Sequence, residues 1–302
     1  MRRDLLTGIK HDIGKKTFVP PDKTPRHERG LKAHSRRLYR WAKPHKARLN
    51  KAGSTKDDDM SNPTAAMLVI GDEILSGRTR DANMYHLANA LTEKGVDLRE
   101  VRVVADDAEA IVAAVNALRG LWDHVFTSGG IGPTHDDITA DCIAAAFEVP
   151  IGVRDDARAL LAAHYARAGT ELNDARLRMA RIPDGATLID NPVSTAPGFT
   201  IGNVHVMAGV PKVFQSMVET VLATITGGAP LLSRSVRIDR GEGDIAGPLG
   251  ALALEFNDLS FGSYPFQREG LYGANIVIRG TQVARLDLAV AALLDAFPEG
   301  VV

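Results

Sequence analysis

The sequence predicts an α/β protein whose mostly parallel sheet is followed by a small α+β domain. Short apolar runs alternate with segments of helical periodicity over residues 64–225, a pattern typical of parallel strands joined by crossover helices. Glycine-rich loops follow two of these runs, in the position where parallel sheets bind ligands. The pattern changes after residues 227–230, GGAP, which form the predicted linker.

The charged residues divide the chain near Met60. The 302 residues carry a net charge of -1, but residues 1–59 hold 17 Lys or Arg and 7 Asp or Glu, a net of +10. Residues 60–302 hold the other 19 basic and 30 acidic residues, a net of -11. A basic segment with few aliphatic residues is typical of disorder. We therefore expect a disordered leader at 1–59, a first domain at 60–229 and a second at 230–302.

Three interpretations of the leader stay open. A basic arm could hold nucleic acid through phosphate contacts. An organelle-targeting peptide is the second interpretation, although four acidic residues between positions 4 and 28 count against it. The third is that translation begins at Met60 and that the upstream residues are not translated.

Composition excludes several classes of protein. No run approaches the roughly 18 apolar residues of a membrane-spanning helix, and the N-terminal region lacks the apolar centre of a secretory signal. Cys142 is the only cysteine, which excludes an internal disulfide and makes the cytoplasm the expected compartment. We expect no membrane partner, and we expect Cys142 to lie in the core.

Each element of the first domain is predicted from its local pattern. Strands are expected where a run of apolar residues ends at a turn signal. The predicted strands are 66–70, 98–104, 124–127, 187–189, 199–201 and 204–207. Helices are expected where apolar residues recur every three or four positions, as Leu87 and Leu91 do before the stop signal Gly95. The predicted helices are 83–94, 108–118, 138–147, 154–168, 173–181 and 213–225.

The second domain is predicted from the same signals. Its predicted strands are 235–238, 259–264 and 275–278, and its predicted helices are 245–256 and 285–297. The sequence GPLG at 247–250 formally matches the GxxG clamp of RNA-binding KH domains. It contains no Lys or Arg, and Glu242 and Asp244 precede it, so nucleic acid is not an expected partner.

Two loops at the predicted carboxyl edge of the sheet carry the strongest chemical signals. The first, GDEILSG at 71–77, places Glu73 between glycines. The second, at 127–141, has three glycines within four positions, which lets the backbone approach a ligand closely. Its acidic residues would repel a phosphate unless a divalent cation lay between them. The sequence therefore predicts a cation-assisted phosphate site, with helix capping by the same acids as the alternative.

Two further segments reach the same edge. The loop at 190–199 carries Asn191 and Ser194, which suit hydrogen bonding to a ribose or base, and a plain tight connection is the alternative. Lys212 opens the next helix, where it either meets a phosphate or lies in solvent.

Four motifs in order give the chain a family resemblance. They are GDEILSG at 71–77, TSGGIGPTHDDIT at 127–139, NPVSTAPGF at 191–199 and MAGVP at 207–211. With them the sequence resembles the competence/damage-inducible protein A family, and within it the molybdopterin-binding-like domain. The resemblance implies a three-layer molybdopterin-binding-like fold with a mostly parallel sheet, followed by the family's small α+β domain. It also implies a short form that stops before the nicotinamide-nucleotide amidase domain.

The resemblance further implies a metal-dependent pyrophosphatase that acts on nucleotide diphosphates of the ADP-ribose or FAD type. Asp137 and Glu73 are then the expected catalytic residues. Together with Asp141 they are the expected ligands of the divalent metal, which is Mg2+, Mn2+ or Co2+. The expected substrate-binding residues are Gly71, Ser128, Gly129, Gly130, Gly132, Thr134, Asn191, Ser194, Gly198 and Lys212.

Two other functions stay open. The chain could bind or adenylylate molybdopterin in molybdenum cofactor metabolism, since proteins of that class use the same fold and would use the same loops. It could instead be a nucleic-acid-associated module that acts through its basic leader. The expected ligand in the enzymatic cases is a nucleotide or molybdopterin-type phosphate, and analogy with related folds predicts a homo-oligomer.

Overall fold

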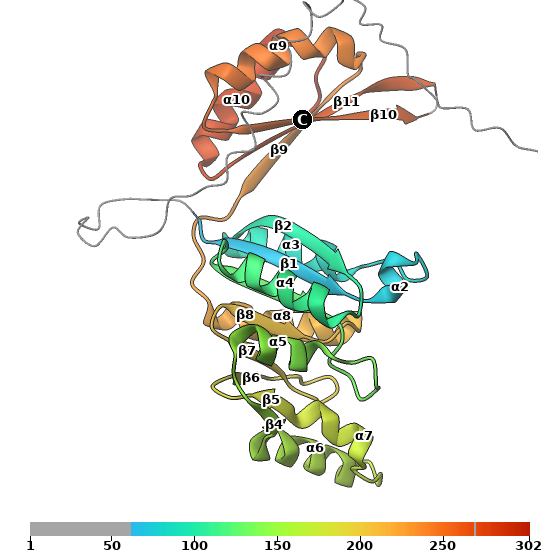
Figure 1. Cartoon of the computed structure of the whole chain (residues 1–302). Coiled ribbons are helices and arrows are strands. Elements are labelled where there is room, and N and C mark those ends of the chain that lie inside the picture. The colour runs from blue at the N-terminus through green and yellow to red at the C-terminus, as the bar shows by residue number, and fades with distance from the viewer. Residues whose placement is uncertain (1–61, 269) are drawn as a thin grey trace, which may run out of the picture. The chain divides into compact units, whose positions relative to one another are not determined.

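The protein is described from a computed structural model, which covers residues 62–268 and 270–302 (Figure 1). The predictions for the leader at 1–59 and for a start at Met60 lie outside the described residues. The described chain forms two main sheets with separate hydrophobic cores, and each is taken by itself.

A six-stranded sheet forms the centre of the first unit, in the order β2-β1-β3-β8-β7-β6. Its strands are β1 (Thr64–Ile70), β2 (Asp97–Val104), β3 (His124–Ser128), β6 (Thr187–Ile189), β7 (Gly198–Ile201) and β8 (Val204–Met207). The first four strands in the sheet order run parallel, whereas β8, β7 and β6 are antiparallel neighbours. The prediction of a mostly parallel sheet is confirmed. The antiparallel end arises because a tight turn at 202–203 joins β7 to β8.

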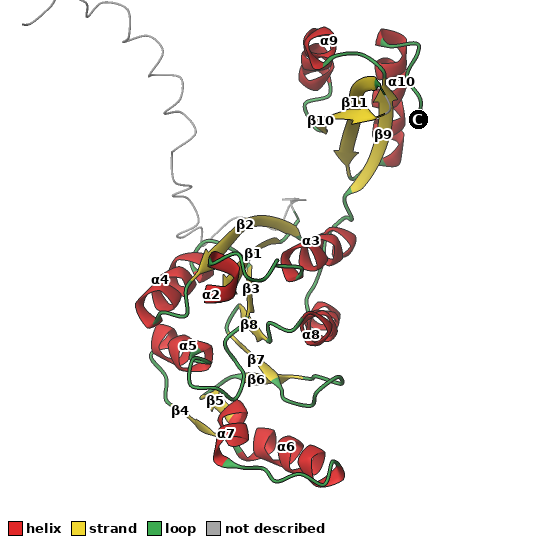
Figure 2. Cartoon of the chain, turned by 90° about the vertical axis from the view of Figure 1, so that its right-hand side faces the viewer, coloured by secondary structure: helices red, strands yellow, loops and turns green. Residues whose placement is uncertain are grey.

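Helices cover both faces of this sheet, which gives three layers (Figure 2). The helices are α2 (Asp72–Leu75), α3 (Asn83–Lys94), α4 (Ala108–Arg119), α5 (Thr139–Phe147), α6 (Asp155–Arg167), α7 (Asp174–Leu177) and α8 (Pro211–Thr224). Alternate residues of β1 point to opposite faces. Leu68 packs in the core that includes α4 and α5, and Met67 packs in the core that includes α3 and α8. Burial on both faces explains why β1 is an unbroken apolar run.

The sequence pattern does not predict three short elements. One is α2, which forms within the first loop, and the others are β4 (Ile151–Val153) and β5 (Arg181–Pro183), which pair as a small antiparallel sheet. The helix predicted at 173–181 is wrong at its end, because α7 stops at Leu177 and a 3-10 turn, Arg178–Ala180, leads into β5. Strands of three residues that pair with a distant segment leave no periodic signal in the sequence.

The second unit is a three-stranded antiparallel sheet in the order β10-β11-β9 with two helices on one face (Figure 1). Its elements are β9 (Leu232–Ile238), α9 (Glu242–Glu255), β10 (Ser260–Arg268), β11 (Leu271–Gly280) and α10 (Val283–Ala296). All five predicted elements are confirmed, with longer strands than predicted. Residues 247–250 lie inside α9, so this GxxG sequence is helical and is not a backbone clamp.

Sequence-based expectations concern the single cysteine and the lengths of the apolar helices, and the structure bears on each. Cys142 on α5 is a free cysteine and is 3% exposed, which confirms its place in the core. Burial raises the pKa of its thiol to about 11. Within the described ranges, no helix is long and apolar enough to span a bilayer.

His205 on β8 gives the fold a dependence on pH. Its ring is 5% exposed and hydrogen-bonds to Thr200 at 3.0 Å and to His124 at 3.2 Å. Burial, with repulsion from His124, lowers the pKa of His205 to about 4. The unfolded chain binds this proton below pH about 6.5, whereas the folded chain does not. Stability is therefore complete above that pH and is lost as the pH falls toward the folded pKa.

Because only the unfolded chain protonates His205 in this range, we expect the free energy of unfolding to fall by about 2 to 3 kcal/mol between pH 7 and pH 4.5. Urea denaturation at the two pH values measures the loss. His205→Gln keeps hydrogen-bonding groups but does not titrate, so its stability should fall less over the same range. Equal losses in the two proteins would contradict this account of His205.

Candidate functional site

The candidate site lies at the carboxyl edge of the six-stranded sheet, beyond the ends of β1, β3 and β8. A cavity of about 400 Å³ opens at this edge. It is lined by Ile70, Gly71, Glu73, Asp106, Gly129, Gly130, Ile131, Gly132, Asp136, Asp137, Met179, Asn191, Ser194, Ala196, Ala208, Gly209, Val210 and Val213. Loops that are far apart in the sequence therefore converge on one space, as expected for a parallel sheet.

Gly129 and Gly130 shape one wall of the cavity. Both have positive φ angles, 110° and 68°. A Cβ atom on Gly129 would overlap the carbonyl oxygen of Ile70, and one on Gly130 would overlap the hydroxyl of Thr139. Thr139 is fully buried and fixes the loop by donating its hydroxyl to the Gly129 carbonyl at 3.0 Å. Side chains therefore do not fit at the two glycines, and both residues line the cavity without one.

Four carboxylates line the same cavity. Glu73 and Asp137, the two expected catalytic residues, are both among them, with Asp136. The fourth, Asp106, follows β2 and was not identified from the sequence; its carboxylate accepts the Asp72 N–H at 3.0 Å. Burial raises the pKa of Asp106, and repulsion from the neighbouring carboxylates acts in the same direction. The cavity therefore concentrates negative charge.

Asp137 is held in place by the loop that precedes it. Its Oδ2 atom accepts the Thr134 N–H at 2.8 Å and the Thr134 hydroxyl at 2.5 Å. Thr134 is an expected phosphate-binding residue, but it hydrogen-bonds to Asp137 and does not itself line the cavity. Its contacts fix the direction of the Asp137 carboxylate, so Thr134 acts on the site through Asp137.

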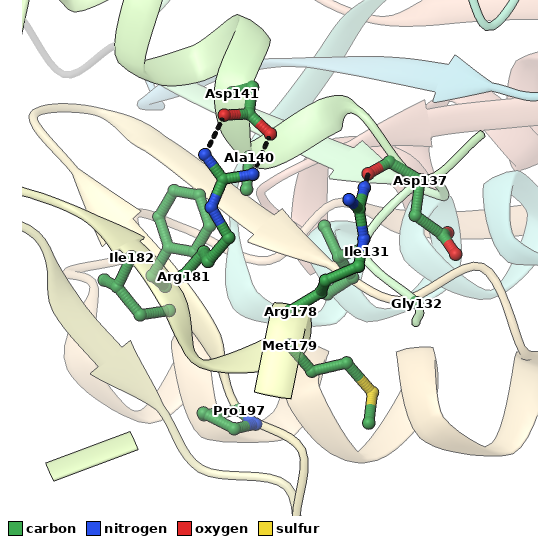
Figure 3. A pocket seen from close by; sticks show the side chains of 12 residues that line it. Ile131, Gly132, Asp137, Ala140, Asp141, Arg178, Met179, Arg181, Ile182 and Pro197 are labelled. Atoms are coloured by element: carbon green, nitrogen blue, oxygen red, sulfur yellow. Dashed lines mark hydrogen bonds and ion pairs between the residues drawn. The ribbon is translucent and has the colours of Figure 1, made fainter. Parts of the chain in front are cut away.

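Asp141 is placed differently from the expected metal ligand. Its two carboxylate oxygens accept hydrogen bonds of 2.8 and 2.6 Å from the guanidinium group of Arg181 on β5 (Figure 3). It does not line the large cavity that contains Glu73. This geometry departs from the expectation that Asp141 binds metal, because both oxygens already have a cationic partner. The pair instead ties α5 to β5.

We expect Asp141→Asn to lower the free energy of unfolding by about 0.5 to 1 kcal/mol, because the ion pair is partly exposed. Arg181→Gln should have a similar effect, and the double variant should lose little more than either single variant. Urea denaturation of the three variants measures this coupling. Unchanged stability of Asp141→Asn, together with weaker activation by metal, would instead support a ligand role.

The donor set of the cavity fits a hard divalent cation. Carboxylate oxygens and backbone carbonyls are the ligands that Mg2+ and Mn2+ prefer. In the part of the chain that the structure describes, no group of three or more His, Cys, Asp or Glu residues is arranged so that it could hold a metal ion by itself. Mg2+ keeps several water molecules and is often bound by one or two carboxylates plus substrate phosphates. A site completed by the substrate is consistent with this arrangement.

The other expected residues divide into two groups. Gly71, Gly132, Asn191 and Ser194 line the cavity. Gly198 and Lys212 do not. A side chain at Gly198 would overlap the backbone of β8, so this glycine serves the sheet. Lys212 is exposed at the start of α8.

Asn191 has a local structural role. It is 2% exposed, and its amide donates to the Ser194 hydroxyl at 2.6 Å and to the Ala196 carbonyl at 2.8 Å. Its oxygen accepts two backbone N–H groups from the same loop. These bonds shape the loop that carries Ser194 to the cavity.

Ser128 is also placed behind the cavity, where it contacts a residue that sequence reasoning missed. The Asn83 amide donates to the Ser128 hydroxyl at 2.8 Å and to the Gly209 carbonyl at 2.7 Å. Asn83 is 3% exposed at the start of α3, so it clamps the ends of β3 and β8 together. The only signal in the sequence was a polar residue at the predicted helix start.

Two family models match the chain. The probable molybdopterin binding domain matches residues 66–229, and the middle domain of FAD synthase matches residues 230–302. Among curated proteins, a probable FAD synthase from Caenorhabditis elegans is 32% identical over 77% of this chain and 49% of its own length. A CinA-like protein from Citrifermentans bemidjiense is 40% identical over 54% of this chain and 40% of its own length. The chain thus spans half or less of these two relatives.

A solved structure is similar to part of this chain in both sequence and fold. The crystal structure of the protein CinA, of unknown function, from Thermoplasma acidophilum is 34% identical and superposes with a TM-score of 0.50. The match covers 54% of this chain and 97% of that chain.

Proposed function

The chain belongs to the competence/damage-inducible protein A family, with a probable molybdopterin binding domain at residues 66–229, and from this we propose that it is a metal-dependent pyrophosphatase. Its proposed substrates are nucleotide diphosphates of the ADP-ribose or FAD type. The likeness to proteins named as probable FAD synthases supports a dinucleotide of this kind, because FAD contains a phosphoanhydride bond between AMP and a flavin phosphate.

One observation carries the proposal. The cavity wall combines bare glycine backbone with four carboxylates, and among the described residues that line it there is no Lys, Arg or His. Glycine backbone at a strand end suits a phosphate, but four carboxylates would repel one. A divalent cation between the carboxylates and the phosphate resolves this conflict. The cavity is also large enough for a nucleotide-sized ligand.

Glu73 and Asp137 are the residues that we propose to hold the cation, with Asp106 and Asp136 adding negative charge to the same cavity. When bound, the cation would polarise the anhydride and lower the pKa of a water molecule. The protein's own residues would bind and orient the substrate. The backbone at Gly129 and Gly130 would receive the phosphates, and the Asn191 loop would contact the nucleoside.

A second candidate is transfer of AMP to a phosphate acceptor, such as a pterin or flavin phosphate. The family match to a probable molybdopterin binding domain and the relation to probable FAD synthases favour it. Such a transfer makes the same phosphoanhydride bond that the hydrolase breaks and would use the same cavity. The two functions differ in whether water or a phosphate oxygen attacks.

We also propose that the chain assembles as a homo-oligomer. Large apolar side chains are exposed close to the cavity, including Leu75 on α2 (55%) and Val210 before α8 (62%). A contiguous apolar patch often marks a protein interface, and these side chains are candidates for one between copies of the chain. Light scattering should give a multiple of the 32.4 kDa chain mass, and a monomer at all concentrations would contradict this expectation.

The proposed function is tested by incubating the full chain with ADP-ribose, FAD or NAD and with Mg2+, Mn2+ or Co2+. Chromatography then follows the release of AMP. We expect AMP from at least one substrate with metal and none with EDTA. If AMP appears only when a pterin or flavin phosphate is supplied with ATP and is found in the joined product, the transferase is the better account.

A further inference from the structure

A small hollow of about 20 Å³ adjoins the large cavity on the side of β5. The two share the residues Gly130, Ile131, Gly132, Asp137 and Met179. The hollow differs from the cavity in its charge, because Arg178 and Arg181 line it (Figure 3). The site as a whole therefore has an acidic part and, directly beside it, a part with guanidinium groups.

The two arginines differ in their partners. Arg181 is neutralised by both oxygens of Asp141. Arg178 makes one long hydrogen bond, from Nη2 to the main-chain carbonyl of Asp137 at 3.3 Å (Figure 3). Its Nε atom is buried without a hydrogen-bond partner, and none of the ion pairs found in the described ranges includes it.

An arginine in this state is poorly satisfied. A buried donor without a partner is unfavourable, and a charged donor more so. The Asp137 carboxylate does not relieve it, because that group is turned toward Thr134. The planar guanidinium group has several donors in a fixed arrangement that matches a phosphate. An anion that arrives with the ligand would supply a partner of this kind.

We propose that Arg178 is the anion-binding residue of the site and receives the phosphate group that leaves when the anhydride bond breaks. This inference rests on the proposed function. Water attacks one phosphorus atom, the bond from that phosphorus to the bridging oxygen breaks, and the bridging oxygen departs with the second phosphate. The departing phosphate gains a negative charge, and the protons of the water are released to solvent or base. Arg178 stabilises this added charge while the carboxylates hold the other end of the site.

Binding of inorganic pyrophosphate to the full chain with Mg2+ present tests the proposal without a nucleotide, because the cation offsets the repulsion from the carboxylates of the adjoining cavity. Isothermal titration should show binding to the wild type that is weakened about 10-fold or more in Arg178→Gln. Arg178→Lys keeps the charge and should recover part of the affinity. Arg176→Gln is the matched control, since Arg176 on α7 packs over the ring of Tyr165 on α6 and does not line either space. Thermal denaturation of each variant shows whether it is folded.

The outcomes separate this proposal from the proposed function. Equal pyrophosphate affinity in the wild type and Arg178→Gln, or no binding to the wild type, overturns the role of Arg178 even if ADP-ribose is cleaved. Binding that depends on Arg178 in a chain that cleaves no nucleotide supports the anion site and refutes the pyrophosphatase. If Arg178→Gln does not fold, Arg178→Lys is compared with the wild type. A several-fold loss of pyrophosphate affinity in the folded Lys variant supports the role of Arg178, and an unchanged affinity overturns it.

Discussion

Replacing Asp137 by Asn should reduce metal-dependent AMP release by about 100-fold or more, which is the loss typical of removing a group that stabilises transition-state charge. Asp137 lines the cavity, and its carboxylate is oriented by two hydrogen bonds from Thr134. Both bonds are accepted by the same oxygen, so the amide oxygen of Asn can keep them, but Asn loses the negative charge that would bind a cation. Steady-state assays with ADP-ribose at several Mg2+ concentrations measure the effect.

Asp155→Asn is the control for this variant. Asp155 is an exposed carboxylate in the first turn of α6 and does not line the cavity. Its removal changes the chain's net charge by the same amount but should leave the assay unchanged. Activity of Asp137→Asn within a few-fold of the wild type would mean that this carboxylate is not part of the chemistry.

Replacing Gly129 by Ala should destabilise the fold by about 3 kcal/mol or more. Two effects act together. The φ angle of Gly129 is 110°, which an L side chain rarely adopts, and its Cβ atom would overlap the carbonyl oxygen of Ile70 on β1. The obstacle is the hydrogen-bonded backbone at the end of β1, so it cannot move aside as a flexible side chain would. Urea denaturation, or the yield of folded protein, measures the loss.

Gly77→Ala separates the two effects. Gly77 also has a positive φ angle, 72°, but a Cβ atom there would meet no atom within 4 Å. We expect a cost of only about 1 to 2 kcal/mol at this position, from backbone strain alone. Equal losses at Gly77 and Gly129 would show that the contact with β1 has no energetic role.

The sequence predicts most of the fold because local patterns carry it. β1 is an unbroken apolar run that is buried on both faces, and α3 shows its period through Leu87 and Leu91. The short β4 and β5 could not be predicted in this way. Each has three residues and is defined by pairing with the other, so its signal lies in a tertiary contact. The same pairing ends the helix predicted at 173–181.

The candidate site shows a similar division. Glu73, Asp137 and the glycines stand in loops directly after predicted strands, so their arrival at one cavity follows from the topology of a parallel sheet. The role of Asp141 depends instead on Arg181, which lies 40 positions away in the sequence and reaches it through β5. Asp106 and Arg178 lie outside the four sequence motifs, so the sequence gives no signal for either residue. Only the folded structure shows that Asp106 lines the cavity and that the Nε atom of Arg178 is buried without a hydrogen-bond partner.

In the proposed mechanism, this acidic, glycine-lined cavity uses a divalent cation to break a phosphoanhydride bond with water. The most direct test is to incubate the full chain with ADP-ribose and Mg2+ or Mn2+ in water enriched in 18O, and to analyse the products by mass spectrometry. The account predicts AMP and ribose 5-phosphate with one 18O atom in one of the two phosphates, and no reaction in EDTA. No cleavage with any of the metals, or cleavage that is undiminished in Asp137→Asn, would contradict it.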